Sequence, residues 1–359
     1  MLSKKIFISC ATLGSGGAER VISVLSSPFA SHYDNVKIIL WISAPIFYDI
    51  DPRVEIVDVE KNAKSTNLLK KMLWFRKYIS KESPDLILSF LYPWSMKVLL
   101  SLFLKKVNVV VAERQDPRVV FGGYPVRILR DLLYIKTKGI TVQTYENQRY
   151  YCKFLQHKLK TVYNPINMPK ETVGKGLSTN KEDAIVTVGR LRKEKNHTLL
   201  INAFAEFLKT HPSYILRIYG GGEEMENLKQ FISEMNLEGK VILMGKTNNV
   251  FSAIENAKLF ILSSNYEGMP NALLEAMCLG LPCISTKVSG ATELIQSGTN
   301  GILVDVNNKK QMVDAMDEIV DNPEKAEKLA RKASELYNTI RLDIIQKEWT
   351  DYVDGILCN

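Results

Sequence analysis

Short apolar runs rich in β-branched residues alternate with longer amphipathic stretches along most of the chain. In the first half, such runs stand at residues 6–10, 36–42, 54–59, 86–90, 107–112 and 140–144. Short continuous apolar runs are typical of strands that are buried on both faces, and helical periodicity fills most of the intervals between them. This pattern predicts a parallel β-sheet with helices on both faces.

The second half of the chain repeats the scheme. Its strand-like runs stand at residues 184–189, 214–220, 240–245, 258–264, 282–287 and 301–304. Only helical patterns follow the last of these runs. Because a parallel sheet needs helical crossovers between its strands, the repetition predicts a second domain of the same kind as the first.

The division between the two halves can be placed from composition. Residues 164–183 are rich in proline, glycine and polar residues, which is typical of a hinge. We therefore predict an α/β chain of two Rossmann-like, doubly wound domains, residues 1–165 and 184–338, joined by a linker at 166–183. A C-terminal helix at 339–359 is expected to cross back to the first domain. Since open α/β sheets bind ligands beyond the carboxyl ends of their strands, we expect the site in a cleft between the two sheets.

A glycine-rich loop follows the first predicted strand. Gly14, Gly16 and Gly17 precede a helix, and glycines at such a place let a backbone approach a phosphate or a sugar at a helix N-terminus. The loop fails the dinucleotide-binding fingerprint, because Glu19 occupies the third glycine position and the second strand supplies no acid for a ribose. The pattern argues against NAD.

A basic loop opens the second domain. The stretch VGRLRKEKNH places Arg190, Arg192, Lys193 and Lys195 between a strand and a helix. Arginine offers a fork of donors and lysine a mobile point charge, so these side chains suit a diphosphate. A merely solvated basic loop explains this stretch equally well when it is considered alone.

Two glutamates flank a turn that leads from a predicted strand into a helix. In NYEGMPNALLEA, Glu267 lies in the turn, Pro270 suits the first helical position, and Asn271 begins a run of free amides. Those amides and the helix dipole favour an anion. Glu275 lies in an otherwise apolar helix and needs a hydrogen-bonding partner there. The stretch therefore predicts a site for a phosphate that carries hydroxylated groups.

Composition narrows the classes of protein. The chain is 46% hydrophobic and 24% charged, and its longest apolar stretch, residues 98–104, is too short to span a bilayer. The apolar run near the N-terminus fits a strand rather than a signal peptide, so we expect an unprocessed cytoplasmic chain. Five scattered cysteines and four histidines show no ligand or disulfide spacing. We predict no metal.

Charge is distributed unevenly. Residues 1–165 hold 25 Lys and Arg against 13 Asp and Glu, a balance of +12, whereas residues 166–359 hold 22 against 26, a balance of −4. Residues 64–81 carry six basic residues and no acid, interleaved with leucines and aromatics at helical spacing. Such a helix could lie on anionic lipid, or it could be a lysine face over an ordinary core stripe. No nucleic-acid-binding motif accompanies the charge.

Taken together, the motifs resemble those of retaining glycosyltransferases of family 4, which have the two-domain GT-B architecture. The resemblance covers nearly the whole chain. It is carried by SGGAER, YNPI, GRLRKEKN, YGGGEE, YEGMPNALLEAMCLGLPCIST, SGATELI and NGILV, in that order. Within the family, the chain is most similar to bacterial enzymes that extend capsular polysaccharide or polyprenyl-diphosphate-linked glycans, including N-acetylgalactosaminyltransferases. The resemblance favours membrane docking for residues 64–81.

The resemblance implies roles for particular residues. Arg190 and Lys195 would bind the donor diphosphate, Glu267 would contact the donor sugar, and Glu275 would hold the ribose. The catalytic residues would be Arg190, Lys195 and Glu267. The other residues expected to bind the donor are Gly16, Gly17, Arg114, Lys246, Val250, Gly268, Met269, Pro270 and Asn271. The chain departs from the family at Arg114, where many relatives have a histidine, and at Gly221, where an acid is common.

The implied reaction transfers a hexose or N-acetylhexosamine from a UDP-sugar, with retention, to a lipid-linked glycan or polysaccharide. The departing phosphate would take the proton of the acceptor, and no metal or other cofactor would be needed. We expect the enzyme in the cytoplasm, peripheral on the inner face of the plasma membrane. A sugar-nucleotide epimerase and a non-catalytic sugar-nucleotide-binding scaffold remain alternatives. The acid pair Asp49 and Asp51 imitates a metal motif of another glycosyltransferase fold, but it lies in a proline-containing turn.

Overall fold

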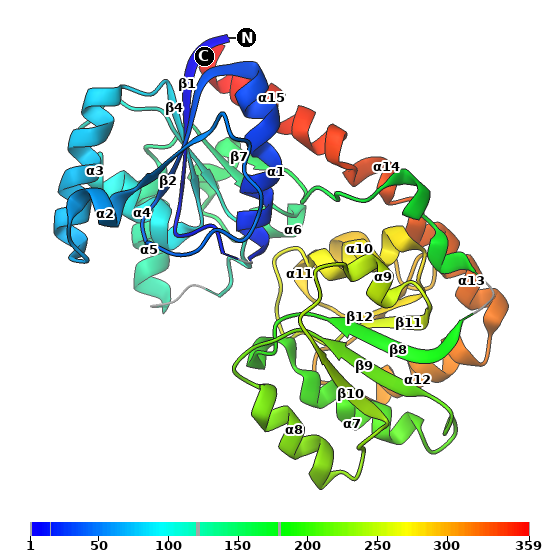
Figure 1. The fold of residues 1–359 in the computed structure, drawn as a ribbon. Helices are drawn as coiled ribbons and strands as arrows, with labels where there is room; N and C mark the ends of the chain where they lie inside the picture. The colour runs from blue at the N-terminus through cyan, green and yellow to red at the C-terminus, as the bar shows by residue number, and fades with distance from the viewer. Residues whose placement is uncertain (1, 15, 120–122, 179–180, 359) are drawn as a thin grey trace. The chain divides into compact units, whose positions relative to one another are not determined.

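The computed structural model describes residues 2–14, 16–119, 123–178 and 181–358. The chain forms two compact units, which are described separately below (Figure 1). Unit 1 comprises Met1–Pro165 and Leu342–Asn359, and unit 2 comprises Ile166–Arg341. Each unit holds one parallel sheet with helices packed against it, so the predicted fold class is confirmed.

Unit 1 contains a seven-stranded sheet of order β3-β2-β1-β4-β5-β6-β7, in which every neighbouring pair is parallel. Its strands are β1 (Leu2–Cys10), β2 (Tyr33–Leu40), β3 (Glu55–Asp58), β4 (Leu86–Phe90), β5 (Val109–Ala112), β6 (Gly139–Val142) and β7 (Leu159–Thr161). Successive side chains enter different cores, because Ile6 and Ile8 pack on one face of the sheet and Phe7 on the other. Burial on both faces explains the continuous apolar runs of the sequence.

The helices of unit 1 divide between these two cores. They are α1 (Gly17–His32), α2 (Val59–Ala63), α3 (Leu68–Glu82), α4 (Tyr92–Ser101), α5 (Gly123–Tyr134), α6 (Tyr145–Gln148) and α15 (Leu342–Cys358). The C-terminal helix α15 packs beside α1 and buries Trp349 in the same core as β1. Near its end, Asp354 accepts hydrogen bonds from the Tyr33 hydroxyl at 2.9 Å and from His32 Nε2 at 2.8 Å. The last helix is therefore an integral part of unit 1.

Unit 2 contains a six-stranded parallel sheet of order β10-β9-β8-β11-β12-β13. Its strands are β8 (Glu182–Val188), β9 (Ile215–Tyr219), β10 (Val241–Gly245), β11 (Ala257–Leu262), β12 (Cys283–Thr286) and β13 (Ile302–Val304). Its α-helices are α7 (His197–Phe207), α8 (Met225–Glu234), α9 (Val250–Ile254), α10 (Asn271–Leu279), α11 (Ser289–Leu294), α12 (Lys309–Val320), α13 (Pro323–Ser334) and α14 (Tyr337–Ile340).

The segment predicted as a hinge has contacts of its own within unit 2. Gly174 donates its backbone N–H to Cys278 O at 3.2 Å, and a Cβ on Gly176 would lie only 2.8 Å from Leu279 O. This part of the segment therefore packs against the end of α10. Ile166 donates to Ile340 O at 2.9 Å and pairs with Arg341, so the chain enters and leaves unit 2 side by side.

None of the described helices is long and apolar enough to cross a membrane.

Candidate donor site

Glycines at the strand ends of unit 2 bring two loops into backbone contact. A Cβ on Gly220, whose φ is +150°, would lie 1.8 Å from Gly189 O, and a Cβ on Gly222 would lie 2.3 Å from Leu191 O. Gly189 donates to Tyr219 O at 2.9 Å across the same contact. Since no larger residue fits at Gly220 or Gly222, the YGGGE stretch fixes the position of the basic loop that begins at Gly189.

Two lysines lie along this glycine cluster. The Lys195 chain passes within 3.6 Å of where a Cβ on Gly189 would be, and the Lys246 chain passes within 3.0 Å of where one on Gly221 would be. Gly221 is the residue that departs from the acid common in relatives. Its missing side chain leaves the space that the aliphatic part of Lys246 occupies.

Lys195 and Glu267 form an ion pair, although they are 72 positions apart in the sequence. Their side chains are only 19% and 14% exposed, so water screens the pair weakly. The carboxylate oxygen that contacts Lys195 also accepts a hydrogen bond from Ser264 Oγ at 2.8 Å, while Ser263 Oγ donates to Lys195 O at 2.8 Å. The structure thus brings together two of the three predicted catalytic residues. Arg190, the third, is exposed on the same loop as Lys195.

Glu267 lies in the turn that connects β11 with α10. Pro270 is the N-cap of this helix, one position before the first helical position predicted for it, and its own side chain makes no capping hydrogen bond. Asn271 is therefore the first helical residue, and the Leu273 N–H donates to Pro270 O at 3.1 Å within this first turn. The positive end of the helix dipole at this turn favours an anion. The turn is held from outside: a Cβ on Gly290 of α11 would lie 2.3 Å from Gly268 O and 2.5 Å from Pro270 Cδ.

Glu275 lies inside α10 and is 3% exposed, among neighbours from Leu273 to Leu279 that are all buried. Its negative charge, after burial, is a cause of the raised pKa of Cys278. Met269 is buried, and Val250 begins α9, where Asn249 caps the helix by accepting from Ser252 N.

His197, which no motif of the sequence marks as a site residue, is the first residue of α7 and follows the basic loop. It is buried, and burial lowers the pKa of His197 to about 4, with a further contribution from the positive charge of Lys195. The imidazole is therefore neutral at physiological pH. Asn196 is the N-cap of α7, in a left-handed conformation with φ +49°, and its side chain accepts from Leu199 N.

The predicted donor-binding residues of the first half lie in unit 1. Gly16 is the N-cap of α1, and Gly17 is its first residue. Arg114 is buried, and its Nη1 donates to Val162 O at 2.8 Å while its guanidinium lies 4.9 Å from the centre of the Trp349 ring. Burial lowers the pKa of Arg114 to about 9. These contacts join β5, β7 and α15, and they favour a structural role for Arg114; its binding of the donor stays a prediction.

Asp51, which with Asp49 imitates a metal motif, forms an ion pair with Arg53. Arg53 donates to it through Nε at 2.9 Å and through Nη2 at 2.8 Å, which holds the pKa of Asp51 well below its usual range. Within the described ranges, no group of three or more His, Cys, Asp and Glu side chains is placed to hold a metal ion.

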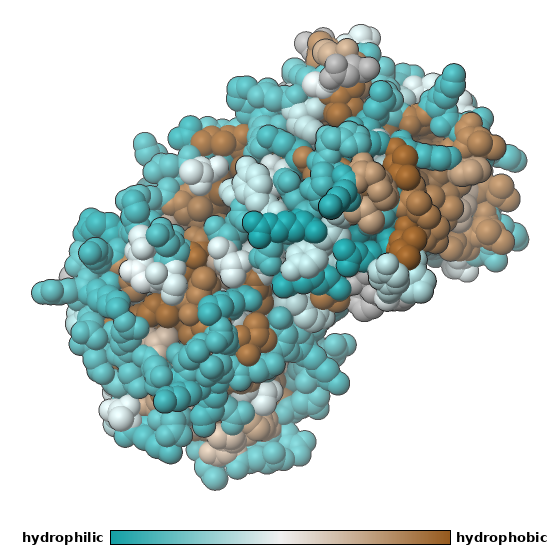
Figure 2. Space-filling model, turned by 180° about the vertical axis from the view of Figure 1, so that it is seen from behind, coloured by the Kyte–Doolittle hydropathy of each residue, from teal (hydrophilic) through white to brown (hydrophobic). Residues whose placement is uncertain are grey.

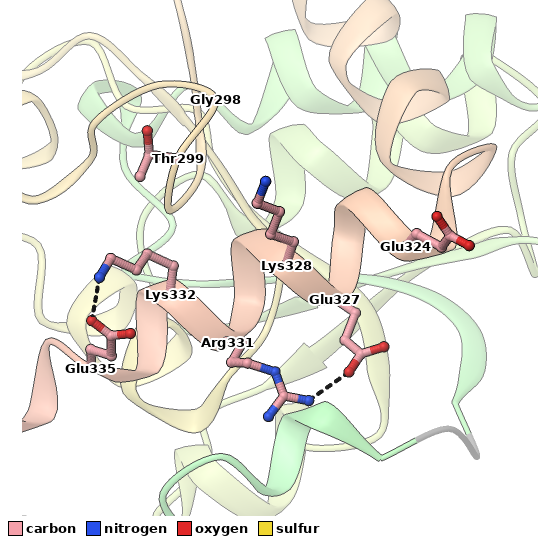
Figure 3. Close-up of a pocket in the computed structure, with 8 residues that line it drawn as sticks. All are labelled: Gly298, Thr299, Glu324, Glu327, Lys328, Arg331, Lys332 and Glu335. Carbon is pink, nitrogen blue, oxygen red and sulfur yellow. Dashed lines mark hydrogen bonds and ion pairs between the residues drawn. The ribbon is translucent and has the colours of Figure 1, made fainter.

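A groove of about 560 Å³ on unit 2 lies apart from these residues, along α13 (Figure 3). Arg331 pairs with Glu327 at 2.6 Å and Lys332 with Glu335 at 2.5 Å. With Glu324 and Lys328, three acids and three bases line it. Their charges balance, so the groove has no net attraction for a diphosphate, and it contains none of the predicted site residues.

Comparison with known proteins gives the class of the chain. The family model for glycosyl transferases group 1 matches residues 170–336. An N-acetylgalactosamine-N,N'-diacetylbacillosaminyl-diphospho-undecaprenol 4-alpha-N-acetylgalactosaminyltransferase of Campylobacter jejuni is 31% identical over 339 residues, which cover 89% of this chain and 91% of that protein. An uncharacterized glycosyltransferase of Haemophilus influenzae is 29% identical over 96% of this chain and 99% of its own length.

Solved structures agree on the fold. Anabaena Alr3699/HepE in complex with UDP-glucose matches with a TM-score of 0.82 and 17% identity, over 98% of this chain and 100% of that one. Fold and relatives together define a glycosyltransferase of GT-B architecture. The chain belongs to the group 1 glycosyl transferases, and the predicted resemblance to family 4 is confirmed.

Proposed function

We propose that this glycosyltransferase moves a hexose or an N-acetylhexosamine from a UDP-sugar, with retention, to a polyprenyl-diphosphate-linked glycan or polysaccharide in bacterial surface-glycan synthesis. The observation that carries the proposal is the pairing of Lys195 with Glu267 in the turn that leads into α10. A cation, a carboxylate and a helix N-terminus at one strand end suit a donor that is both a diphosphate and a sugar.

The Lys195–Glu267 pair suggests how the donor would bind. A diphosphate that carries more negative charge than Glu267 would compete for the Lys195 ammonium, with Arg190 as a second cation. Glu267 would then be able to accept hydrogen bonds from sugar hydroxyls. The hydrogen bond that Ser264 donates to Glu267 would keep the carboxylate in its orientation. Glu275, inside α10, would accept from the ribose. The donor would thus replace an internal ion pair with two sets of contacts.

Catalysis would come from the stabilisation of charge on the leaving diphosphate. Once the donor is bound, Lys195, Arg190 and the N-terminus of α10 would already face the diphosphate, so little reorganisation would be needed as charge develops. The departing phosphate oxygen would accept the proton of the attacking hydroxyl on the same face of the sugar. In this scheme the side chains supply the positive charge, and no metal is needed.

The acceptor and the membrane belong to the same proposal. Relatives from Campylobacter jejuni and Escherichia coli are named for undecaprenyl-diphosphate-linked acceptors. A lipid-linked acceptor requires the enzyme to work at a membrane surface, for which we propose the cytoplasmic face of the plasma membrane. The basic stretch at residues 64–81 would contact anionic lipid there.

Purified protein incubated with labelled UDP-sugars, with and without a lipid-linked acceptor, tests the proposal. UDP release that depends on the acceptor, together with an α-linked product, is expected from a UDP-α-sugar. A changed sugar without acceptor would instead indicate an epimerase, and binding without turnover would indicate a scaffold. Thermal protection by a panel of UDP-sugars would identify the donor before the assay.

A further inference from the structure

Unit 1 exposes large apolar side chains on three neighbouring segments. They are Leu69 and Leu73 of α3, Phe103 and Leu104 after α4, and Leu129 and Leu132 of α5. Leu104 is 81% exposed, Leu69 is 69% and Leu73 is 61%. Figure 2 shows hydrophobic residues gathered on the side of unit 1 where Figure 1 places α3, α4 and α5. We call this surface the leucine–lysine face.

Direct contacts make the leucine–lysine face continuous. Arg76 of α3 donates through Nη1 to Ser101 O at 2.9 Å and to Phe103 O at 2.8 Å. Lys136, just after α5, places its ammonium 3.7 Å from the centre of the Phe103 ring. The loop that carries Phe103 and Leu104 is therefore attached to α3 on one side and to the end of α5 on the other.

The face is positively charged. Residues 64–81 and 91–112 contain no acid, and the acid of residues 123–138 is Asp131, which is buried and bound by Arg130. Exposed lysines stand among the leucines, at Lys70, Lys77, Lys105, Lys106, Lys136 and Lys138. Apolar groups among basic groups, with no exposed acid in these segments, match a surface that is anionic outside and apolar beneath.

Two details of the face are unlike an ordinary helix exterior. In α3 the core is made by Phe75 and Ile79, and Lys71 is buried with its ammonium on Trp41 O at 3.0 Å. Leu69 and Leu73, which could have been core residues, point outward instead. Leu104 has a φ of +66°, a left-handed conformation that costs a leucine about 1 kcal/mol or more. The fold thus holds its most exposed leucine in a strained position.

We propose that the leucine–lysine face binds an anionic lipid bilayer, with Phe103, Leu104 and the outer leucines of α5 entering the headgroup layer and the lysines meeting lipid phosphates. This inference rests on the proposed function, whose membrane contact it makes more specific. The main lipid-binding segment is then the loop after α4 rather than α3. A second copy of the chain fits less well, because a two-fold contact through this face would place lysines against lysines.

Vesicle binding by the full chain tests the proposal. Phosphatidylcholine vesicles with and without phosphatidylglycerol are mixed with the protein and floated on a density gradient. Binding is expected with phosphatidylglycerol and should weaken at high ionic strength. The double variant Phe103→Ser/Leu104→Ser should lose about tenfold or more in partitioning. Lys105→Glu/Lys106→Glu should lose at least about fivefold for each lysine, because each change removes a positive charge and adds a negative one.

Matched controls come from elsewhere in the chain. Ile344→Ser removes an exposed apolar side chain from α15, and Lys309→Glu/Lys310→Glu reverses an adjacent exposed pair on α12. Both should bind as the unchanged protein does. Leu104→Gly is the most informative single change, because it relieves the positive φ while it removes the side chain. It should bind vesicles more weakly and yet melt no lower, whereas a merely structural leucine would lower the melting temperature.

Three results would overturn the proposal: no binding of the unchanged protein to anionic vesicles, equal binding by the loop variants, or a dimer in light scattering that these variants dissociate. Its failure is distinguishable from failure of the proposed function. Sugar transfer to a short-chain, water-soluble polyprenyl-diphosphate acceptor does not need a bilayer. Transfer to that acceptor without vesicle binding would refute the proposed lipid-binding face alone. Vesicle binding without transfer would refute the proposed transferase activity.

Discussion

Units 1 and 2 share one architecture but use the ends of their sheets differently. In unit 2, the backbone contacts of Gly220 and Gly222 hold two loops close together at the strand ends. The partly exposed side chains of Lys195 and Glu267 lie at this end of the sheet. In unit 1, the end of β5 carries Glu113 and Arg114, both buried. Glu113 accepts from Tyr92 N at 3.1 Å and from the Tyr134 hydroxyl, and burial raises its pKa.

The comparison shows that charge alone does not mark a site. In unit 1, Glu113 and Arg114 at the end of β5 are buried and bind neighbouring helices, whereas the exposed lysines of the leucine–lysine face lie on other segments. Unit 2 places charged side chains at strand ends beside the N-terminus of α10. The variants below test this division of roles, beginning with the largest expected effect.

Glu267→Ala should reduce sugar transfer by at least about a hundredfold, because it removes the carboxylate that holds Lys195 and that would contact the donor sugar. The melting temperature should fall only moderately, since Lys195, which loses its partner, keeps some access to water. Glu324→Ala, on α13 of the same unit, is the control and should retain full activity. Full activity in Glu267→Ala would remove this residue from the site.

Gly290→Ala should reduce transfer by about tenfold or more. Its Cβ would meet Gly268 O at 2.3 Å and displace the turn that positions Glu267 and α10. Gly355→Ala in α15 of unit 1 has open space around it and should be neutral or slightly stabilising. Steady-state kinetics and thermal melting of both variants separate a displaced site from a destabilised fold. Unchanged kinetics for Gly290→Ala would show that the turn adapts.

Most of the fold could be predicted from the sequence, because buried strands leave long apolar runs. The exception is β7, whose three residues, Leu159–Thr161, are too few and too polar to make such a run. The strand predicted at 54–59 ends earlier, at Asp58, because that side chain accepts from Lys61 N and starts α2. Capping of this kind competes with strand propensity at a single residue.

The candidate site could be predicted less completely. Glu267 and Lys195 stood out because their motifs follow predicted strands, whose ends meet in a parallel sheet. The close contact of Gly290 could not be foreseen, since it depends on how α11 packs against a turn far away in sequence. Nor could the outward leucines of α3, because a helix with leucines on several faces does not specify which face is buried.

Arg114→Met should destabilise unit 1 by about 2 kcal/mol, because the charge-assisted hydrogen bond to Val162 O and the contact with Trp349 are lost. If the role of Arg114 is structural, the affinity for the UDP-sugar will not change. Denaturation followed by tryptophan fluorescence reports on unit 1, since all four tryptophans lie there. A weaker donor affinity at unchanged stability would instead support the predicted donor binding, and unit 1 would take part in the site.

His197 gives unit 2 a pH dependence that an exposed histidine does not have. Its pKa falls from 6.5 to about 4 on burial, so as the pH drops through this window the unfolded chain takes up a proton that the folded one refuses. The contribution of neutral His197 to the free energy of unfolding is fully present above about pH 6.5 and decreases towards pH 4. At pH 5 the loss is about 2 kcal/mol. Hydrogen exchange of the α7 amides at pH 7.5 and pH 5, corrected for intrinsic rates, should show this loss, and His197→Gln should reduce it. The exposed His157→Gln in unit 1 is the control, and an equal response in the two variants would mean that the buried imidazole does not govern the basic loop.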